Sequence, residues 1–137
     1  LIGVVAGILA FAASNAASPL AIGDNPHLAA LILLALLALG ALAQVGIRFT
    51  QRETISFAFA ILNLVGHLAL LVALLRVPDQ PTLAMVFGGC YALGQLVKLQ
   101  FLRATGYTEG GANTTGMLGI AALMAILYAL LAVLMLF

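Results

Sequence analysis

Two neighbouring apolar segments, residues 55–76 and 82–103, each carry a row of polar side chains at helical spacing. The candidates for ligand binding or for buried polar contacts are Asn63 and His67 in the first row and Tyr91, Gln95 and Lys98 in the second. Steps of three and four residues bring each row onto one face of a helix. Because hydrocarbon offers no hydrogen bonds, we expect both faces to point into the protein.

The depth of these residues in a membrane decides which of them can meet. The connection between the two segments contains two prolines and predicts a hairpin of antiparallel, neighbouring helices. Counting about 1.5 Å per residue from that connection, Asn63 and Gln95 reach one level near mid-membrane. His67 and Tyr91 reach a second level. We therefore predict two hydrogen-bonded polar pairs that hold the hairpin in register.

A histidine at this depth has several chemical uses. His67 could be an axial ligand of haem, but the other histidine, His27, falls in a predicted surface turn. His67 could also belong to a proton relay with Tyr91 and Lys98, or bind a quinone. The acidic residues all fall in loops, which disfavours a carboxylate-driven proton pump: Asp24, Glu53, Asp79 and Glu109. We predict no cofactor, leave haem and quinone open, and favour a structural hydrogen bond from His67 to Tyr91 or Asn15.

Sets of residues that support enzyme chemistry are missing from the pattern. No serine, histidine and aspartate share one depth, no H-E-x-x-H sequence occurs, and no glycine-rich phosphate loop precedes a helix. The histidines and the single Cys90 are not spaced as metal ligands, so no metal site is predicted. We therefore expect a protein that is not an enzyme.

The composition indicates an integral membrane protein. Of the 137 residues, 65% are hydrophobic and only 7% are charged, whereas roughly a quarter of residues are charged in soluble domains. The net charge of +1 comes without a basic cluster, so nucleic acid is not expected as a partner. Apolar runs of spanning length predict one all-α domain, a polytopic transmembrane helical bundle with short loops. The five predicted spans lie near residues 1–22, 28–47, 55–76, 82–103 and 116–137.

Small residues on the first segment predict close helix packing. Gly3 and Gly7 form a G-x-x-x-G pattern that continues with Ala10 and Ser14. Such a ridge lets the backbone of another helix approach closely, although chance produces the same pattern about as often in an alanine-rich chain. We expect this face to contact a helix of the same chain or of a partner.

Basic residues are distributed unevenly between the two sides of the predicted bundle. Arg48 and Arg52 precede the third span, and Lys98 and Arg103 end the fourth, whereas Arg76 lies on the other side. The larger group consists of Arg48, Arg52, Lys98 and Arg103. The positive-inside rule places this group and the N-terminus on the cytoplasmic side. We expect an integral protein of a cell inner membrane.

Two functions remain compatible with the sequence. The favoured interpretation is a small non-enzymatic subunit or assembly partner of a larger membrane complex, in contact with lipid and with other subunits or copies of itself, because the chain has almost no aqueous mass. The alternative is a small carrier or ligand-binding protein for a proton, quinone, haem or small apolar ligand that uses the polar residues of the third and fourth segments. A cavity between those helices would favour the alternative.

The predicted topology can be tested by labelling single cysteines in a chain that carries Cys90→Ala. Thr50→Cys should react with a membrane-impermeant reagent from the cytoplasmic side, and Asp79→Cys only from the opposite side, because one span separates the two positions. Reaction of both cysteines from the same side would show that the number of spans is wrong.

Overall fold

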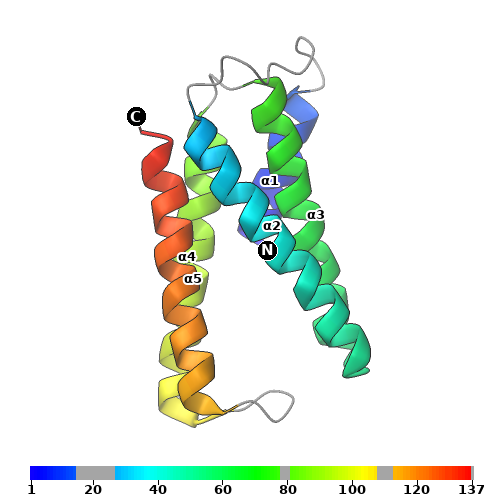
Figure 1. Cartoon of the computed structure of the whole chain (residues 1–137), viewed down its shortest axis with the longest axis vertical. Helices are drawn as coiled ribbons and strands as arrows, with labels where there is room; N and C mark the ends of the chain where they lie inside the picture. Colours follow the sequence, from blue (N-terminus) through cyan, green and yellow to red (C-terminus); the bar gives the residue numbers. More distant parts are fainter. Residues whose placement is uncertain (15–26, 78–80, 108–112, 137) are drawn as a thin grey trace.

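The computed structural model describes residues 1–14, 27–77, 81–107 and 113–136, and the regular structure within these residues is entirely helical. The predicted all-α helical bundle is therefore confirmed. The five helices are α1 (Ile2–Ser14), α2 (Leu28–Thr50), α3 (Thr54–Arg76), α4 (Pro81–Thr105) and α5 (Thr114–Leu134) (Figure 1). Alanine and leucine, which favour helix, recur through them. Pro81 occupies the first helical position of α4, where its missing N–H leaves no helical hydrogen bond unmade.

Four of the described helices are long and apolar enough to cross a membrane, namely α2, α3, α4 and α5 with 23, 23, 25 and 21 residues. At about 1.5 Å per residue, each reaches the roughly 30 Å needed to span the hydrocarbon layer. These helices make the chain an integral membrane protein. The described part of the first segment, α1, has 13 residues. The rest of the span predicted over 1–22, including Asn15, lies outside the described residues.

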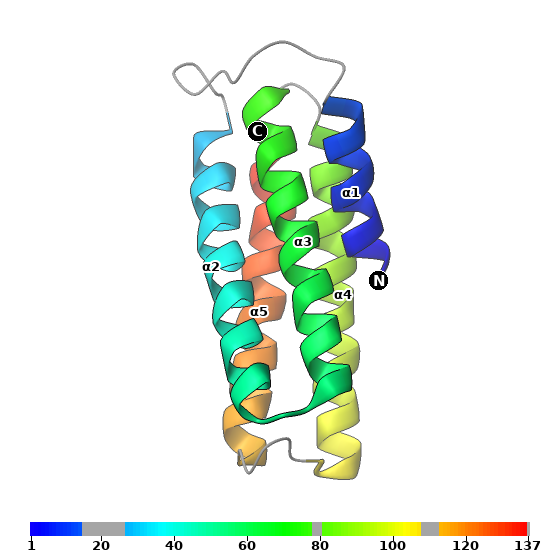
Figure 2. The same ribbon diagram turned by 90° about the vertical axis from the view of Figure 1, so that its right-hand side faces the viewer.

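The long helices alternate in direction, and α1 runs in the same direction as α3 (Figure 2). The main contacts join α4 to α5, α3 to both α1 and α2, and α1 to α4. The helices α3 and α4 are antiparallel, as predicted, but their backbones do not lie side by side as a hairpin of neighbouring helices would require. The small residues of α1 allow this helix to pack closely against both α3 and α4, and α3 and α4 meet each other through side chains such as His67 and Phe87.

The buried core lies toward one end of the bundle. We call this the upper end, where α2 and α4 begin in Figures 1 and 2, and the opposite end the lower end. Fully buried side chains from the four long helices meet in the core: Leu34, Leu70, Phe87 and Leu131. In α2, every buried residue lies between Ala30 and Ala38, in the upper half of the helix. Toward the lower end, α2 and α3 diverge from α4 and α5 (Figure 1).

Glycines bring α1 against its neighbours. A Cβ atom at Gly7 would collide with the backbone carbonyl oxygen of Gly66 on α3, and a Cβ atom at Gly66 would lie 2.9 Å from the Cα atom of Val4. A Cβ atom at Gly3 would collide with the ring of Tyr91 on α4. The backbones of α1 and α3 can therefore approach this closely only because glycine occupies both sides of the crossing.

The turn between α2 and α3 is short and held by local contacts. It comprises the three residues 51–53, and Arg52 takes a left-handed backbone conformation with φ of 55°. An ion pair of 3.5 Å between Arg48 and Glu53 spans the turn. These features hold α2 and α3 together at the lower end, so the bundle opens between helix pairs and not within this pair.

The glycine crossing makes a prediction about stability. Gly7→Ala should destabilise the folded bundle by about 1–3 kcal/mol, because the new methyl group meets backbone that cannot move aside. Gly119→Ala on α5 is the control, since nothing lies within 4 Å of its added Cβ atom. Unfolding in mixed detergent, followed by circular dichroism, measures both variants. Equal unfolding midpoints for the two variants would contradict the close α1–α3 contact.

Candidate functional site

A cavity opens between the helix pair α2–α3 and the helix pair α4–α5. Its volume is about 520 Å³, within the range of small-molecule sites in proteins. All five residues singled out in the sequence line it: Asn63, His67, Tyr91, Gln95 and Lys98. The sequence placed a site on α3 and α4, and the structure adds walls from α2 and α5.

A hydrogen-bonded network closes the upper end of the cavity. His67, Tyr91 and Tyr128 are the uppermost lining residues of α3, α4 and α5. The Nε2 atom of His67 lies 2.5 Å from the hydroxyl oxygen of Tyr128, and its Nδ1 atom lies 2.6 Å from the backbone oxygen of Asn63. Tyr91 donates its hydroxyl proton to Oδ1 of Asn63 over 3.0 Å. The network therefore ties three helices together near the middle of their length.

The carbonyl group of Asn63 determines the directions of these bonds. A carbonyl oxygen can only accept, so the Nδ1 atom of His67 carries a proton and donates it. In a neutral imidazole the Nε2 atom is then an acceptor, and Tyr128 donates to it. Both tyrosine protons are thereby used inside the protein. The tyrosine oxygens retain only acceptor capacity.

Aromatic rings pack around the same network. Tyr91 and Tyr128 stack with ring centroids 4.8 Å apart, and His67 meets the fully buried Phe87 edge to face at 5.1 Å. Aromatic pairs of this kind contribute about 0.5–1.5 kcal/mol each beyond the burial of their area. The rings and the hydrogen bonds together make the upper end of the cavity a rigid boundary.

The hydrogen-bond partners predicted from the sequence are corrected by this arrangement. His67 and Tyr91 do meet, with ring centroids 5.0 Å apart, but His67 bonds to Tyr128 and Tyr91 bonds to Asn63. Within the described residues, Gln95 makes no hydrogen bond. The tyrosine side chain is long enough to reach one helical turn along α3, from the level of His67 to that of Asn63. The depth of a residue along its helix gives no information about this reach, so the sequence could not predict the partner of Tyr91.

The lower part of the cavity has a different character. Gln95 and Lys98 lie about one and two turns below Tyr91 on α4, and Ser56 lines the cavity from α3. Gln44 and Arg48 contribute polar groups from α2. The side chains below the network therefore offer amides, a hydroxyl and two cations to the space between the helix pairs.

Tyr128 is the main residue that the sequence prediction missed. The same count of depth would have found it, because Tyr91 lies 14 residues before the end of α4 at Thr105 and Tyr128 lies 14 residues after the start of α5 at Thr114. Two antiparallel helices joined at the lower end bring such positions to one level.

The geometry of His67 bears on cofactor binding. Both of its ring nitrogens are engaged in hydrogen bonds, so ligation of haem iron would require it to give up Tyr128 or the Asn63 carbonyl group. In the parts of the chain that the structure describes, no group of three His, Cys, Asp or Glu side chains is placed to hold a metal ion. His27, the other histidine, is the N-cap residue of α2. It therefore lies at the upper end of the bundle, away from this network.

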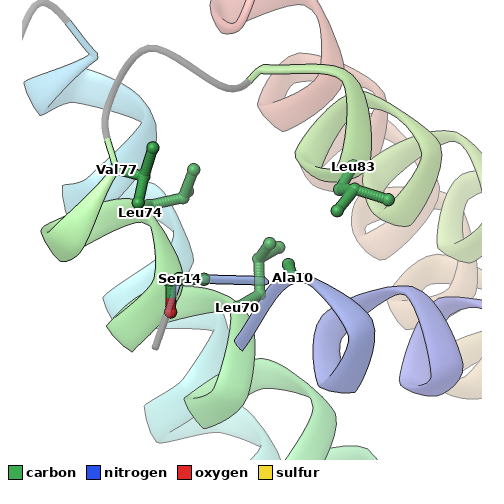
Figure 3. Close-up of a pocket in the computed structure, with 7 residues that line it drawn as sticks. Ala10, Ser14, Leu70, Leu74, Val77 and Leu83 are labelled. Carbon is green, nitrogen blue, oxygen red and sulfur yellow. The ribbon is translucent and has the colours of Figure 1, made fainter. Parts of the chain in front are cut away.

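A second hollow lies near the upper end, between α1, α3 and the start of α4 (Figure 3). Its volume is about 10 Å³, room for about one water molecule. Ser14 is the polar side chain in its lining, and the Ser14 hydroxyl group donates a hydrogen bond to the backbone oxygen of Phe11 at 2.8 Å. This hollow is a packing feature and is too small for a ligand.

The chain matches no protein-family model, no curated protein and no solved structure. The fold and the site therefore define a class, a small integral membrane bundle with a polar-lined internal cavity.

The His67–Tyr128 bond can be measured by a double-mutant cycle. His67→Leu and Tyr128→Phe should each destabilise the bundle, by about 0.6–2 kcal/mol for the lost interhelical hydrogen bond. The double variant should lose less than the sum of the two single losses, because either change alone breaks the same bond. Tyr107→Phe, at an exposed tyrosine beyond α4, is the control. Strictly additive losses would show that the two side chains do not interact.

Proposed function

We propose that this protein binds a small amphipathic molecule within the membrane, in the cavity between α2–α3 and α4–α5. The observation that carries the proposal is a cavity of about 520 Å³ whose lining combines apolar and polar side chains. Ligand sites typically have this size and combine apolar walls with a few convergent polar groups. The proposed role is non-enzymatic and corresponds to a carrier or a ligand-binding membrane protein.

The lining of the cavity supports an amphipathic ligand. Its apolar walls include Phe59 on α3 and a row on α5. That row consists of Met117, Ile120 and Met124. The polar groups of Ser56 and Gln95 line the same space. A ligand with an apolar body and one polar group would bury the body against the apolar walls and give the Gln95 amide a hydrogen-bond partner.

A role as a subunit of a membrane complex has weaker support. Large apolar side chains are exposed on the outside of the long helices: Leu36, Leu39, Val97 and Ile126. Lipid covers such side chains as well as a partner protein does. The outer surface therefore does not distinguish a free protein from a subunit, whereas the cavity favours ligand binding.

The excess of basic residues at the lower end supports a cytoplasmic position for that end.

A tryptophan reporter can test whether the cavity is occupied. The chain contains no tryptophan, so Phe59→Trp introduces a single fluorophore in the cavity wall. Phe101→Trp is the matched control, because Phe101 is also exposed and also about one turn from the lower end of its helix, but lies outside the cavity lining. In bilayer nanodiscs, a lauryl alcohol brominated in the middle of its chain should quench the residue-59 reporter at lower ligand concentration than the residue-101 reporter. Equal quenching would mean that the alcohol only dissolves in lipid, and would reject the proposal.

Filling the cavity should weaken binding of the alcohol and so reduce the difference in quenching between the two reporters. Gly40 lines the cavity, and the space where its Cβ atom would lie is empty to 4 Å. Gly40→Leu should therefore place a side chain in the ligand's space. The alcohol concentration needed to quench the residue-59 reporter should rise about tenfold. Gly46→Leu is the control, since its Cβ site is equally open but is not part of the cavity lining. Unchanged quenching in the Gly40 variant would place the ligand elsewhere.

A further inference from the structure

We infer that the ligand carries an anionic head, held at the lower mouth of the cavity by Lys98 and Arg48, with its apolar body directed upward toward Tyr128. The inference rests on the proposed function and specifies the chemical class of the ligand, an amphipathic anion such as a long-chain carboxylate.

The charged side chains among the described residues of the lining have one sign. Lys98 on α4 and Arg48 on α2 line the cavity, and none of the described side chains that line it is acidic. The two cations come from opposite helix pairs (Figure 1). A cationic ligand would meet the charge of Lys98, which no carboxylate of the described lining offsets, and like charges in contact are costly. The charge pattern therefore selects an anion.

Lys98 is the stronger candidate of the two. Arg48 already donates to the Oε1 atom of Gln51 at 3.0 Å and pairs with Glu53 at 3.5 Å. Lys98 makes no ion pair or hydrogen bond to any residue that the structure describes. Its ammonium group has three donors, and a carboxylate at the mouth would use them while remaining close to water. We therefore assign the main contact with the anionic head to Lys98.

The upper end of the cavity is unsuitable for an anion. The hydroxyl protons of Tyr91 and Tyr128 are donated to Asn63 and His67, so the two phenolic oxygens present lone pairs. A negative charge beside these lone pairs would be repelled and far from water. The apolar row on α5 lies between this end and the mouth. The ligand is therefore oriented with its charge down and its chain up.

The experiment compares three brominated ligands of one chain length: lauric acid, lauryl alcohol and laurylamine. With the Phe59→Trp reporter in nanodiscs of zwitterionic lipid at neutral pH, the acid should bind about tenfold more tightly than the alcohol. The amine should bind more weakly than the alcohol. The Phe101→Trp reporter, measured with the same ligands, corrects for partition into lipid. Equal binding of the acid and the alcohol would overturn the inference.

Variants of the lysine test the contact itself. Lys98→Gln should reduce the preference for the acid over the alcohol to about threefold or less, and Lys98→Arg should retain it, because the charge is preserved. Arg103→Gln is the control, since Arg103 is a basic residue near the same end of α4 that does not line the cavity. Retention of the full preference in Lys98→Gln, or an equal loss in Arg103→Gln, would show that Lys98 does not hold the head.

A competition experiment identifies the source of the anion. Unlabelled laurate should relieve quenching by its brominated form, whereas butyrate at equal concentration should not, because it lacks the chain that fills the apolar part of the cavity. Equal competition by butyrate would overturn the amphipathic part of the inference and identify a soluble organic anion.

Different results would reject the proposed function and the anionic head. If no ligand distinguishes the residue-59 reporter from the residue-101 reporter, the proposed function fails, whereas binding without charge preference rejects only the anionic head.

Discussion

The arrangement of this bundle depends on the requirement that polar groups at membrane depth find hydrogen-bond partners inside the protein. His67 satisfies it with two bonds, one to Tyr128 and one to the backbone of Asn63, and Asn63 accepts a further bond from Tyr91. Each bond contributes modestly, because the unfolded chain in a membrane also finds partners for these groups. The larger effect is geometric. The network brings the middle of α3, α4 and α5 to one point, and the rest of the bundle is organised above and below it.

Packing differs on the two sides of this network. Above it, α1 approaches α3 through Gly7 and Gly66, and the largest buried side chains fill the space between the long helices. Dense contact of this kind is the main source of helix association in lipid, where burying apolar surface brings no hydrophobic gain. Below the network, α2 and α3 remain joined by their short turn but diverge from α4 and α5 (Figure 1). The cavity is the consequence of a bundle packed firmly at one end and open at the other.

Much of this architecture follows from the sequence alone. Apolar runs interrupted by short polar stretches determine the number and approximate limits of the helices, because a backbone in hydrocarbon must bond within its own helix. The predicted spans at 28–47, 55–76, 82–103 and 116–137 lie close to the helices α2 to α5. Helical spacing also selected the polar residues that line the cavity, since amides and charged groups avoid lipid. The sequence thus determined the helices and, for α3 and α4, the face that turns inward.

The tertiary structure alone decided how those faces combine. The depth of residues along a helix limits which of them can meet. Which residues do meet depends on the length of their side chains and on whether a third helix lies between the two helices. Tyr91 bonds to Asn63 and not to His67, and α1 packs against both α3 and α4. The contribution of Tyr128 and the walls from α2 depend on contacts between residues far apart in the chain. The cavity has no local signal in the sequence, because its volume arises from the angle between helix pairs, which is set by the sum of their packing contacts.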